Sequence, residues 1–356
     1  MLSRETCAVL LKELEKLLDG RPMRFMEVCG THTVSLFQSG LKALLPSSIT
    51  HLSGPGCPVC VTHDSEIAAF LRLAEEKDVC IATFGDLLRV PGPNGMSLKH
   101  AKAKGADIAI VYSPLDALAL AQKNPHKTVC FLGIGFETTA PTVAATILCA
   151  QERKISNFCV YALHKCVPPV LRALLADPNT HIDAFLLPGH VSTILGLKPY
   201  AFVAEEFGIP GVVGGFAPEE MLLALCMMAK AFVEKKPCIR NAYTKAVRPE
   251  GNPHARQCME QVFEPANALW RGLGEIAESG LRIREPYALF DATKRFAMQT
   301  DYVPAPTGCR CGEILKGVLQ PKECPLFGKR CTPANPVGPC MVSTEGSCAA
   351  WFKYGV

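Results

Sequence analysis

The stretch RFMEVCGTH, residues 24–32, shows the pattern on which the fold prediction depends: a short, largely apolar run over 24–28 leads directly into Cys29, Gly30, Thr31 and His32. Comparable apolar runs recur at residues 49–52, 79–83, 107–112, 129–134, 158–162, 184–187 and 211–213. Helical patterns lie between them, at 64–76, 114–122, 141–152, 168–176 and 218–234. Apolar strands that alternate with helices predict an α/β fold with parallel sheets covered on both faces.

The number of these units predicts two related parallel-sheet α/β domains, because eight strands exceed one small sheet. We place them at residues 23–125 and 126–240, with a boundary near residues 123–128. Leucines at helical spacing in residues 1–22 predict an amphipathic N-terminal helix that ends at Gly20. Residues 241–356 form a third predicted domain, in which 252–278 are expected to be helical with a break at Pro265.

Composition excludes several classes of protein. The 356 residues are 49% hydrophobic and 20% charged, as in ordinary globular proteins, and the net charge of +4 is too small to indicate a nucleic-acid or membrane-surface partner. The longest apolar run, 221–229, is far shorter than the ~20 residues that span a bilayer. We therefore expect a cytoplasmic protein. In a reducing cytosol its 18 cysteines indicate metal binding or redox chemistry rather than a disulfide framework.

Residues capable of chemistry follow the predicted strands. They are Cys29 and His32, Cys57 and Cys60, Asp86, Glu137 with Thr138 and Thr139, His164, and His190. Sites in open α/β sheets form outside the carboxyl ends of the strands, so this placement predicts a cleft between the two sheets. The alternative is that the glycines among these residues only shape turns, that Thr139 is a plain helix cap, and that His164 and His190 are structural.

The sequence Cys57-Pro58-Val59-Cys60 is a C-x-x-C motif. In a cytosolic α/β setting it indicates a dithiol/disulfide couple, and half of a metal site is the alternative. Neighbouring parallel strands would bring Cys29 close to Cys57. Two thiolates with the imidazole of His32 nearby suit a low-spin iron or copper(I).

The C-terminal segment 304–356 is rich in Pro, Gly and Cys and predicts little regular structure, so it needs a staple such as a metal site. Its six cysteines are Cys309, Cys311, Cys324, Cys331, Cys340 and Cys348. They contain no C-x-x-C pair of the kind that zinc sites normally use. A [4Fe–4S] cluster, structural zinc and free thiols all remain open on spacing alone.

Nine motifs, in this order, resemble those of the HypD family of hydrogenase maturation factors. They are EVCGTH (27–32), GPGCPVC (54–60), TFGDLLRVPG (83–92), YSPLDAL (112–118), GFETT (135–139), PGHVS (188–192), CGEIL (311–315), CPLFGKRC (324–331) and MVSTEGSCAAW (341–351). Their order and spacing are specific to the family, and the resemblance covers nearly the whole chain. It departs at Thr33-Val34-Ser35, where the family usually has a further polar, often histidine-containing stretch. A role for a second histidine is therefore not carried over.

The resemblance implies a scaffold that assembles the Fe(CN)2CO unit of [NiFe]-hydrogenases rather than a conventional turnover enzyme. It implies work with the small chaperone HypC, transient contact with HypE, which donates cyanide-derived groups and is charged by HypF, and a third domain that holds a [4Fe–4S] cluster. We expect Cys29 to be the principal ligand of the substrate iron, with Cys57 second and His32 close by. Glu137, Thr138, Thr139 and His190 are expected around it, and Cys60 as the partner of Cys57.

For the cluster we expect Cys311, Cys324, Cys331 and Cys348 as ligands, with Cys309 and Cys340 as spare thiols. Cys311 is preferred over Cys309 because it opens the Cys-Gly-Glu motif, although Cys309 is only two residues away. Two other functions remain open. One is an iron–sulfur thiol–disulfide reductase that acts on small-protein disulfides, and the weaker one is a zinc-bound interaction module.

Overall fold

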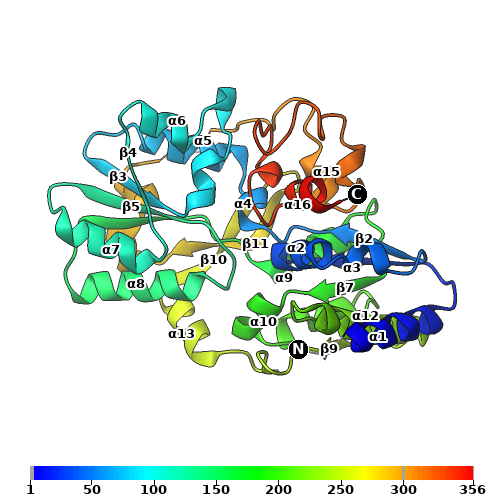
Figure 1. Ribbon diagram of the computed structural model, residues 1–356. Coiled ribbons are helices and arrows are strands. Elements are labelled where there is room, and N and C mark those ends of the chain that lie inside the picture. Colours follow the sequence, from blue (N-terminus) through cyan, green and yellow to red (C-terminus); the bar gives the residue numbers. More distant parts are fainter. Residues whose placement is uncertain (1–3, 299–300, 356) are drawn as a thin grey trace.

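The computed structural model describes residues 4–298 and 301–355 of the chain, and its main features are two parallel sheets, a two-stranded hairpin and a cysteine-rich C-terminal region (Figure 1). The five-stranded sheet has the order β2 (Ile49–Ser53), β1 (Met23–Glu27), β7 (Ala184–Leu187), β8 (Gly211–Val213), β9 (Ile239–Asn241). The four-stranded sheet has the order β4 (Asp107–Ile110), β3 (Val79–Thr83), β5 (Thr128–Gly133), β6 (Phe158–Ala162). The α/β class with two parallel sheets is therefore confirmed.

The division between the two sheets differs from the one expected. Strands β1 and β2 share a sheet with β7, β8 and β9 from much later in the chain, through the pairing of β1 with β7, and the four-stranded sheet lies in sequence between them. The predicted boundary near residues 123–128 falls between β4 and β5, which belong to the same sheet. Hydrophobic periodicity identifies strands but not their partners, so the sequence pattern could not show that the second sheet is inserted into the first.

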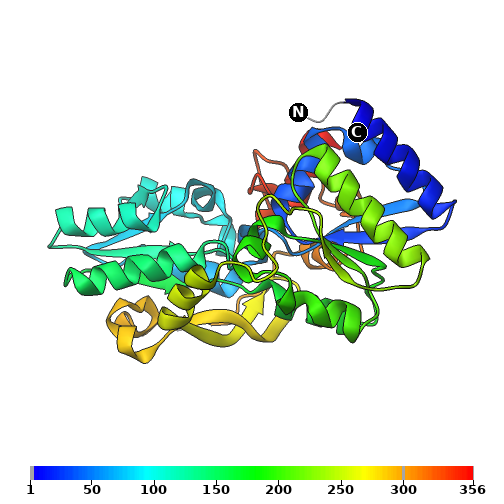
Figure 2. The same ribbon diagram turned by 90° about the horizontal axis from the view of Figure 1, so that it is seen from below.

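Helices cover both faces of each sheet. The longer ones are α1 (Arg4–Leu18), α2 (Gly30–Gln38), α5 (Asp64–Leu73), α7 (Pro114–Lys123), α8 (Ala140–Glu152), α9 (Val167–Ala176), α12 (Pro218–Val233) and α13 (Pro253–Val262). The shorter ones are α3 (Leu41–Leu44), α4 (Pro58–Val61), α6 (Leu98–Ala103), α10 (Gly189–Leu195), α11 (Ala201–Glu205), α14 (Ala292–Arg295), α15 (Cys311–Leu315) and α16 (Ser347–Tyr354). Helix α1 packs against α12 through the buried Leu14 and Leu18, and ends just before Gly20 as predicted. Figure 2 shows both ends of the chain on the side of the molecule that contains the five-stranded sheet.

Consecutive strand residues face separate cores, which explains why the strands are apolar throughout. On β1, Phe25 and Met26 belong to different buried clusters, and on β5 the same is true of Phe131 and Leu132. Alternate side chains of a strand point to opposite faces, so both faces of both sheets are buried. Each large apolar side chain removed from water contributes about 1.5–3 kcal/mol. One cluster extends from both sheets into the C-terminal region, so that the three parts share a core.

The prediction of helix over 252–278 is correct only as far as Val262. The chain then forms an antiparallel hairpin of β10 (Phe263–Trp270) and β11 (Gly274–Ile283). Pro265 cannot stand inside a helix, but on a two-stranded ribbon its missing N–H can face outward. Gly272 in the connecting turn and Gly274 at the start of β11 take left-handed φ angles of 72° and 81°. In the described ranges, no helix combines the length and the apolarity that a bilayer span requires.

Candidate functional site

A cavity of about 250 Å³ lies outside the carboxyl ends of strands from both sheets, where the sequence predicts a cleft. Cys29 and Thr31 from the loop and helix after β1 line one side of it. The side chains of Thr138 and Thr139 line the other side, beyond β5. A larger depression of about 590 Å³ lies at the opposite, amino-terminal ends of β3 and β4, away from every residue that the motifs single out.

Cys29 stands at the junction of β1 and α2, as the N-cap of that helix. Only 8% of its surface is exposed, and burial raises the pKa of the Cys29 thiol to about 12. The loop that carries the second motif packs directly against it: the Gly30 N–H donates to the Gly56 carbonyl at 3.0 Å. The predicted approach of these two neighbouring loops is confirmed by the parallel pairing of β1 with β2.

A buried polar cluster lies behind Cys29. Glu27 accepts a hydrogen bond from the Cys29 N–H at 3.0 Å and another from the Thr33 hydroxyl. The Nε2 atom of His51 is 3.6 Å from the Glu27 carboxyl group. Burial raises the pKa of Glu27 to about 8 and lowers that of His51 to about 3. Thr33, at the point where the sequence departs from the family pattern, therefore orients the carboxyl group that holds the Cys29 backbone.

The two predicted histidines near this cavity have different surroundings. His32 is fully buried and its Nε2 atom is 3.0 Å from the Gly215 carbonyl, so Nε2 carries the proton. Burial lowers the pKa of His32 to about 4, which keeps the ring neutral. His190 lines the cavity and stacks on Phe216, whose ring also lies close to that of His32. Of the two, His190 is the histidine whose side chain borders the cavity.

The polar residues of the motif GFETT (135–139) differ in whether they reach the cavity. Thr138 and Thr139 line the cavity, whereas Glu137 does not. Glu137 is buried and accepts a hydrogen bond from the Val167 N–H at 2.8 Å, at the start of α9. Burial raises its pKa to about 7. Thr139 occupies the N-cap position of α8, but its hydroxyl donates to the Phe136 carbonyl instead of capping the helix.

His164 also follows a strand, but it is not among the residues that line the cavity. It is buried against Gly133 and Gly135, and neither ring nitrogen has a hydrogen-bond partner among the described residues. Burial lowers the pKa of His164 to about 3, so the ring stays neutral. The ring packs against Gly135, which lines the cavity, but His164 itself does not line it.

Glu345 lines the cavity from the C-terminal region, although the sequence pattern does not predict it there. Its carboxylate accepts a hydrogen bond of 2.7 Å from the Thr31 hydroxyl. The same residue packs against Gly30, where an added Cβ would stand 2.5 Å from the Glu345 Cβ. Glu345 lies inside the motif MVSTEGSCAAW (341–351), so the sequence contains an indication of its importance. The cysteines of the C-terminal segment, however, indicate a metal cluster and not a contribution to this cavity.

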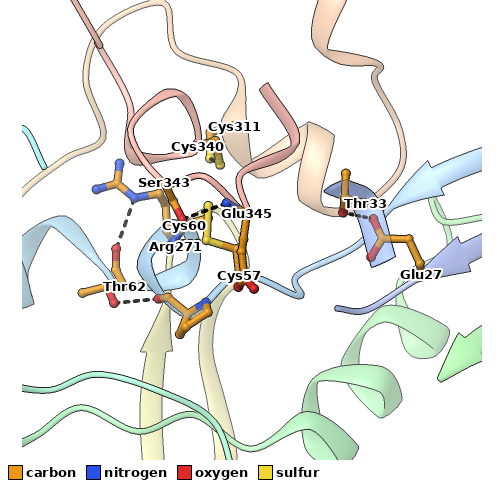
Figure 3. Close-up of a disulfide and its surroundings, with 11 residues drawn as sticks. Glu27, Thr33, Cys57, Cys60, Thr62, Arg271, Cys311, Cys340, Ser343 and Glu345 are labelled. Carbon is orange, nitrogen blue, oxygen red and sulfur yellow. Dashed lines mark hydrogen bonds between the residues drawn. A yellow bond between two sulfur atoms is a disulfide. The ribbon is translucent and has the colours of Figure 1, made fainter. Parts of the chain in front are cut away.

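Cys57 and Cys60 form a disulfide on the one-turn helix α4 (Figure 3). Their Cα atoms are 5.2 Å apart, within the usual range for a disulfide. Neither cysteine lines the cavity, but Pro58 and Val59 between them do. The disulfide thus lies directly behind the wall of the cavity that contains Cys29.

The six C-terminal cysteines line one small apolar pocket, together with Ile314, Leu326, Phe327 and Met341. This donor set, with more than four thiols converging from separate loops, fits the ligand requirement of an iron–sulfur cluster. The Val337 N–H donates to the Cys331 sulfur at 3.4 Å, the kind of hydrogen bond that tunes a cluster-bound thiolate. No group of three metal-binding side chains is already in ligating position within the described part of the chain.

Within this pocket Cys311 and Cys340 form a close pair. Their sulfur atoms are 3.0 Å apart and both side chains are buried. Cys340 lies on the 3₁₀ helix η6 (Pro339–Met341), which packs against α4 and so brings the pair next to the Cys57–Cys60 disulfide (Figure 3). The sulfur of Cys311 is therefore paired with that of Cys340. Cys309, two residues before Cys311, has no such contact with Cys340, which leaves its thiol as the other candidate for a cluster ligand.

The chain is similar to known proteins over nearly its whole length. A family model named HypD and described as "Hydrogenase formation hypA family" matches residues 5–355. The hydrogenase maturation factor HypD2 of Bradyrhizobium diazoefficiens is 44% identical over 99% of this chain and 95% of its own length. The hydrogenase maturation factor HypD of Escherichia coli is 45% identical over 94% of this chain and 90% of its own. That of Rhodobacter capsulatus is 43% identical over 97% and 94%.

Proposed function

Because the chain belongs to the HypD family of hydrogenase maturation factors, we propose that it is the scaffold on which the Fe(CN)2CO unit of a [NiFe]-hydrogenase is assembled. The observation that carries this proposal is the position of Cys29: a thiol on a cavity that both sheets and the C-terminal region line, with a disulfide behind its wall. The substrate iron is the cargo of this site, and Cys29 is its principal ligand.

Thiolate ligands suit this cargo. Cyanide and CO draw electron density from iron, and soft thiolates supply it. The pKa of Cys29, raised by burial to about 12, means that its thiol must lose a proton when iron binds. His190 and Glu345 are titratable groups on the same cavity that can accept it. Thr138 would offer its hydroxyl group to the nitrogen atom of a bound cyanide, whereas the hydroxyl proton of Thr139 is already donated to the Phe136 carbonyl.

Cys57 is the second iron ligand in this proposal, and it becomes available only when its disulfide with Cys60 is reduced. An external dithiol that closes its own disulfide supplies the two electrons and two protons that reduce the pair and free the Cys57 sulfur. An external disulfide that takes up two electrons and leaves as a dithiol re-forms the Cys57–Cys60 bond and withdraws Cys57 from iron, which gives the scaffold a way to release its product. Pro58 and Val59, between the two cysteines, line the cavity. Opening or closing the disulfide would therefore alter the cavity wall at these two residues.

Three of the C-terminal thiols, Cys324, Cys331 and Cys348, are proposed to hold a [4Fe–4S] cluster with a fourth ligand from the Cys309/Cys311 pair. When bound, such a cluster supplies single electrons at a buried position. The sequence favours Cys311 for the fourth place, but its 3.0 Å contact with Cys340 favours Cys309. Burial raises the pKa of the Cys348 thiol well above its ordinary value. If no metal binds, the thiol therefore stays neutral, and the alternative to a cluster is an apolar pocket of neutral thiols.

The proposed partners are a HypC-type chaperone and, transiently, HypE as the cyanide donor, in the cytoplasm. An anaerobic preparation of the chain with its co-expressed chaperone tests this by infrared spectroscopy. Stretching bands of CO and cyanide on the complex would support the scaffold, and their absence from an iron-loaded complex would contradict it.

A second function remains supported by one observation. The Cys57–Cys60 disulfide lies beside six thiols suited to an iron–sulfur cluster, which is also the arrangement of an iron–sulfur thiol–disulfide reductase. Reduction of small-protein disulfides by the purified chain, without any infrared bands of CO or cyanide, would favour this alternative.

A further inference from the structure

The CPVC turn is held by a residue more than 200 positions away. Helix α4 has a single turn, so the carbonyl groups at its carboxyl end lack partners within the helix. The Arg271 N–H donates to the Val61 carbonyl at 2.9 Å, and the Arg271 Nε donates to the Thr62 carbonyl at 3.2 Å. One arginine at the end of β10 thus closes the carboxyl end of the turn that carries both sulfurs (Figure 3).

The guanidinium group of Arg271 has no freedom to move away. Its second terminal nitrogen donates to the Asp64 carboxylate at 2.6 Å, and the two side chains are only 2% and 5% exposed. Breaking a buried pair of this kind is costly because the remaining charge loses its partner. Trp270 beside it is also buried and donates to the Ser279 hydroxyl at 2.8 Å, which fixes the hairpin end.

The same hairpin end touches the C-terminal cysteines. Gly272, the residue after Arg271, packs so closely on Gly312 that an added Cβ would stand 2.1 Å from the Gly312 Cα. Gly312 directly follows Cys311. The segment 270–272 is therefore the junction that fixes the CPVC turn relative to the Cys311/Cys340 pair.

We propose that Arg271 is a positioning residue for the Cys57/Cys60 couple, one that holds the CPVC turn in the geometry needed for the disulfide. The inference rests on the proposed function, in which this couple is redox-active. A fixed turn keeps one thiol close to the other and so raises its effective concentration for ring closure. Loosening the turn lowers that concentration and shifts the equilibrium toward the dithiol.

The experiment measures the thiol–disulfide equilibrium of the anaerobically purified full chain in mixtures of reduced and oxidised dithiothreitol. Dithiothreitol loses two electrons and two protons as it closes its own disulfide, and Cys57 and Cys60 each take up one electron and one proton. Thiol labelling and mass spectrometry of the peptide that contains both cysteines give the fraction reduced.

Arg271→Gln removes the hydrogen bond to Thr62 and the charge, and we expect the equilibrium to shift toward the dithiol by about tenfold. A tenfold shift corresponds to about 30 mV for a two-electron couple. Arg271→Lys keeps a charge for Asp64 but lacks the Nε–H, and we expect a shift of roughly threefold in the same direction. The lysine variant decides the question if the glutamine variant does not fold.

The matched control is Arg284→Gln. Arg284 donates to the Glu260 and Phe263 carbonyls at the opposite end of the hairpin, so its loss perturbs the same element without touching α4. We expect the wild-type equilibrium constant from this control. If the wild-type protein titrates but both Arg271 variants match it, the inference about Arg271 is wrong. If the wild-type cysteines do not titrate at all, the redox role in the proposed function is wrong and the inference falls with it.

Discussion

The backbone of Gly56 lies directly against that of Cys29, close enough that a Cβ atom on Gly56 would stand 2.2 Å from the Cys29 nitrogen. Glycine is required here because any side chain would push apart the two loops that carry Cys29 and the CPVC turn. The cavity therefore depends on the close parallel pairing of β1 and β2, whose ends meet at this point.

Gly56→Ala is expected to destabilise the protein by about 1–3 kcal/mol, since the clash is with backbone rather than with a flexible side chain. Denaturant unfolding measures the change. Gly85→Ala is the matched control, because a Cβ there would meet only the Ile110 side chain, at 3.8 Å. Equal stability of the two variants would show that the Gly56 contact does not constrain the site.

The fourth ligand of the proposed cluster can be identified by counting iron. We expect Cys309→Ala to lose most of the about four iron atoms per chain that a [4Fe–4S] cluster contains, and Cys311→Ala to keep them. The reason is the 3.0 Å contact between the Cys311 and Cys340 sulfurs, which two separate cluster ligands would not make. Iron loss from Cys311→Ala with retention in Cys309→Ala would restore the assignment made from the sequence.

Glu137 is expected to make stability fall as pH rises. Its pKa is raised by burial from 4.5 to about 7, so between these values the folded state binds more protons than the unfolded state. Stability from this group is present in full below pH 4.5 and is lost as pH rises to about 7, by up to about 1.4 kcal/mol per pH unit.

Glu137→Gln removes that dependence. The free energy of unfolding of the variant, minus that of the wild type, should therefore increase across the same pH range. Unfolding curves measured at several pH values test it, and a constant difference would contradict the burial argument. Normal hydrogenase maturation by this variant would also show that the charge of Glu137 has no part in the proposed function.

Cys57 and Cys60 are expected to differ in iron binding. Cys57→Ala removes the proposed second ligand, whereas Cys60→Ala leaves Cys57 as a free thiol that cannot be withdrawn into a disulfide. Iron content of the reconstituted complex should therefore fall further in Cys57→Ala than in Cys60→Ala. Equal losses would contradict the choice of Cys57 over Cys60 as the second ligand, and unchanged iron content in both variants would indicate that neither sulfur reaches the iron.

Much of the fold could be predicted because apolar strands and Pro-initiated helices leave clear local patterns. The strands at 79–83, 158–162, 184–187 and 211–213 have the expected bounds. The hairpin at β10 and β11 could not be predicted, because its residues alternate only partly and the preceding helix α13 continues the same pattern up to Val262. Strand partners were also inaccessible, since pairing depends on contacts between distant residues.

The site was predictable where residues directly follow strands. Cys29, Thr138 and Thr139 line the cavity for that reason, together with His190. Glu345 could not be found in this way, because it lies in an irregular loop and reaches the cavity only through the packing of the C-terminal region on α2. Nor could spacing reveal the pairing of Cys311 with Cys340, which are 29 residues apart.

In the proposed function, Cys29 holds the iron of the Fe(CN)2CO unit. Infrared spectroscopy of the anaerobic complex with the chaperone, in wild-type protein and in Cys29→Ala, tests this assignment, with the visible absorption of the proposed [4Fe–4S] cluster recorded on the same samples. We expect Cys29→Ala to lose the CO and cyanide bands while the cluster absorption is unchanged. Full CO and cyanide bands in Cys29→Ala would show that the iron is held elsewhere and that Cys29 is not its principal ligand.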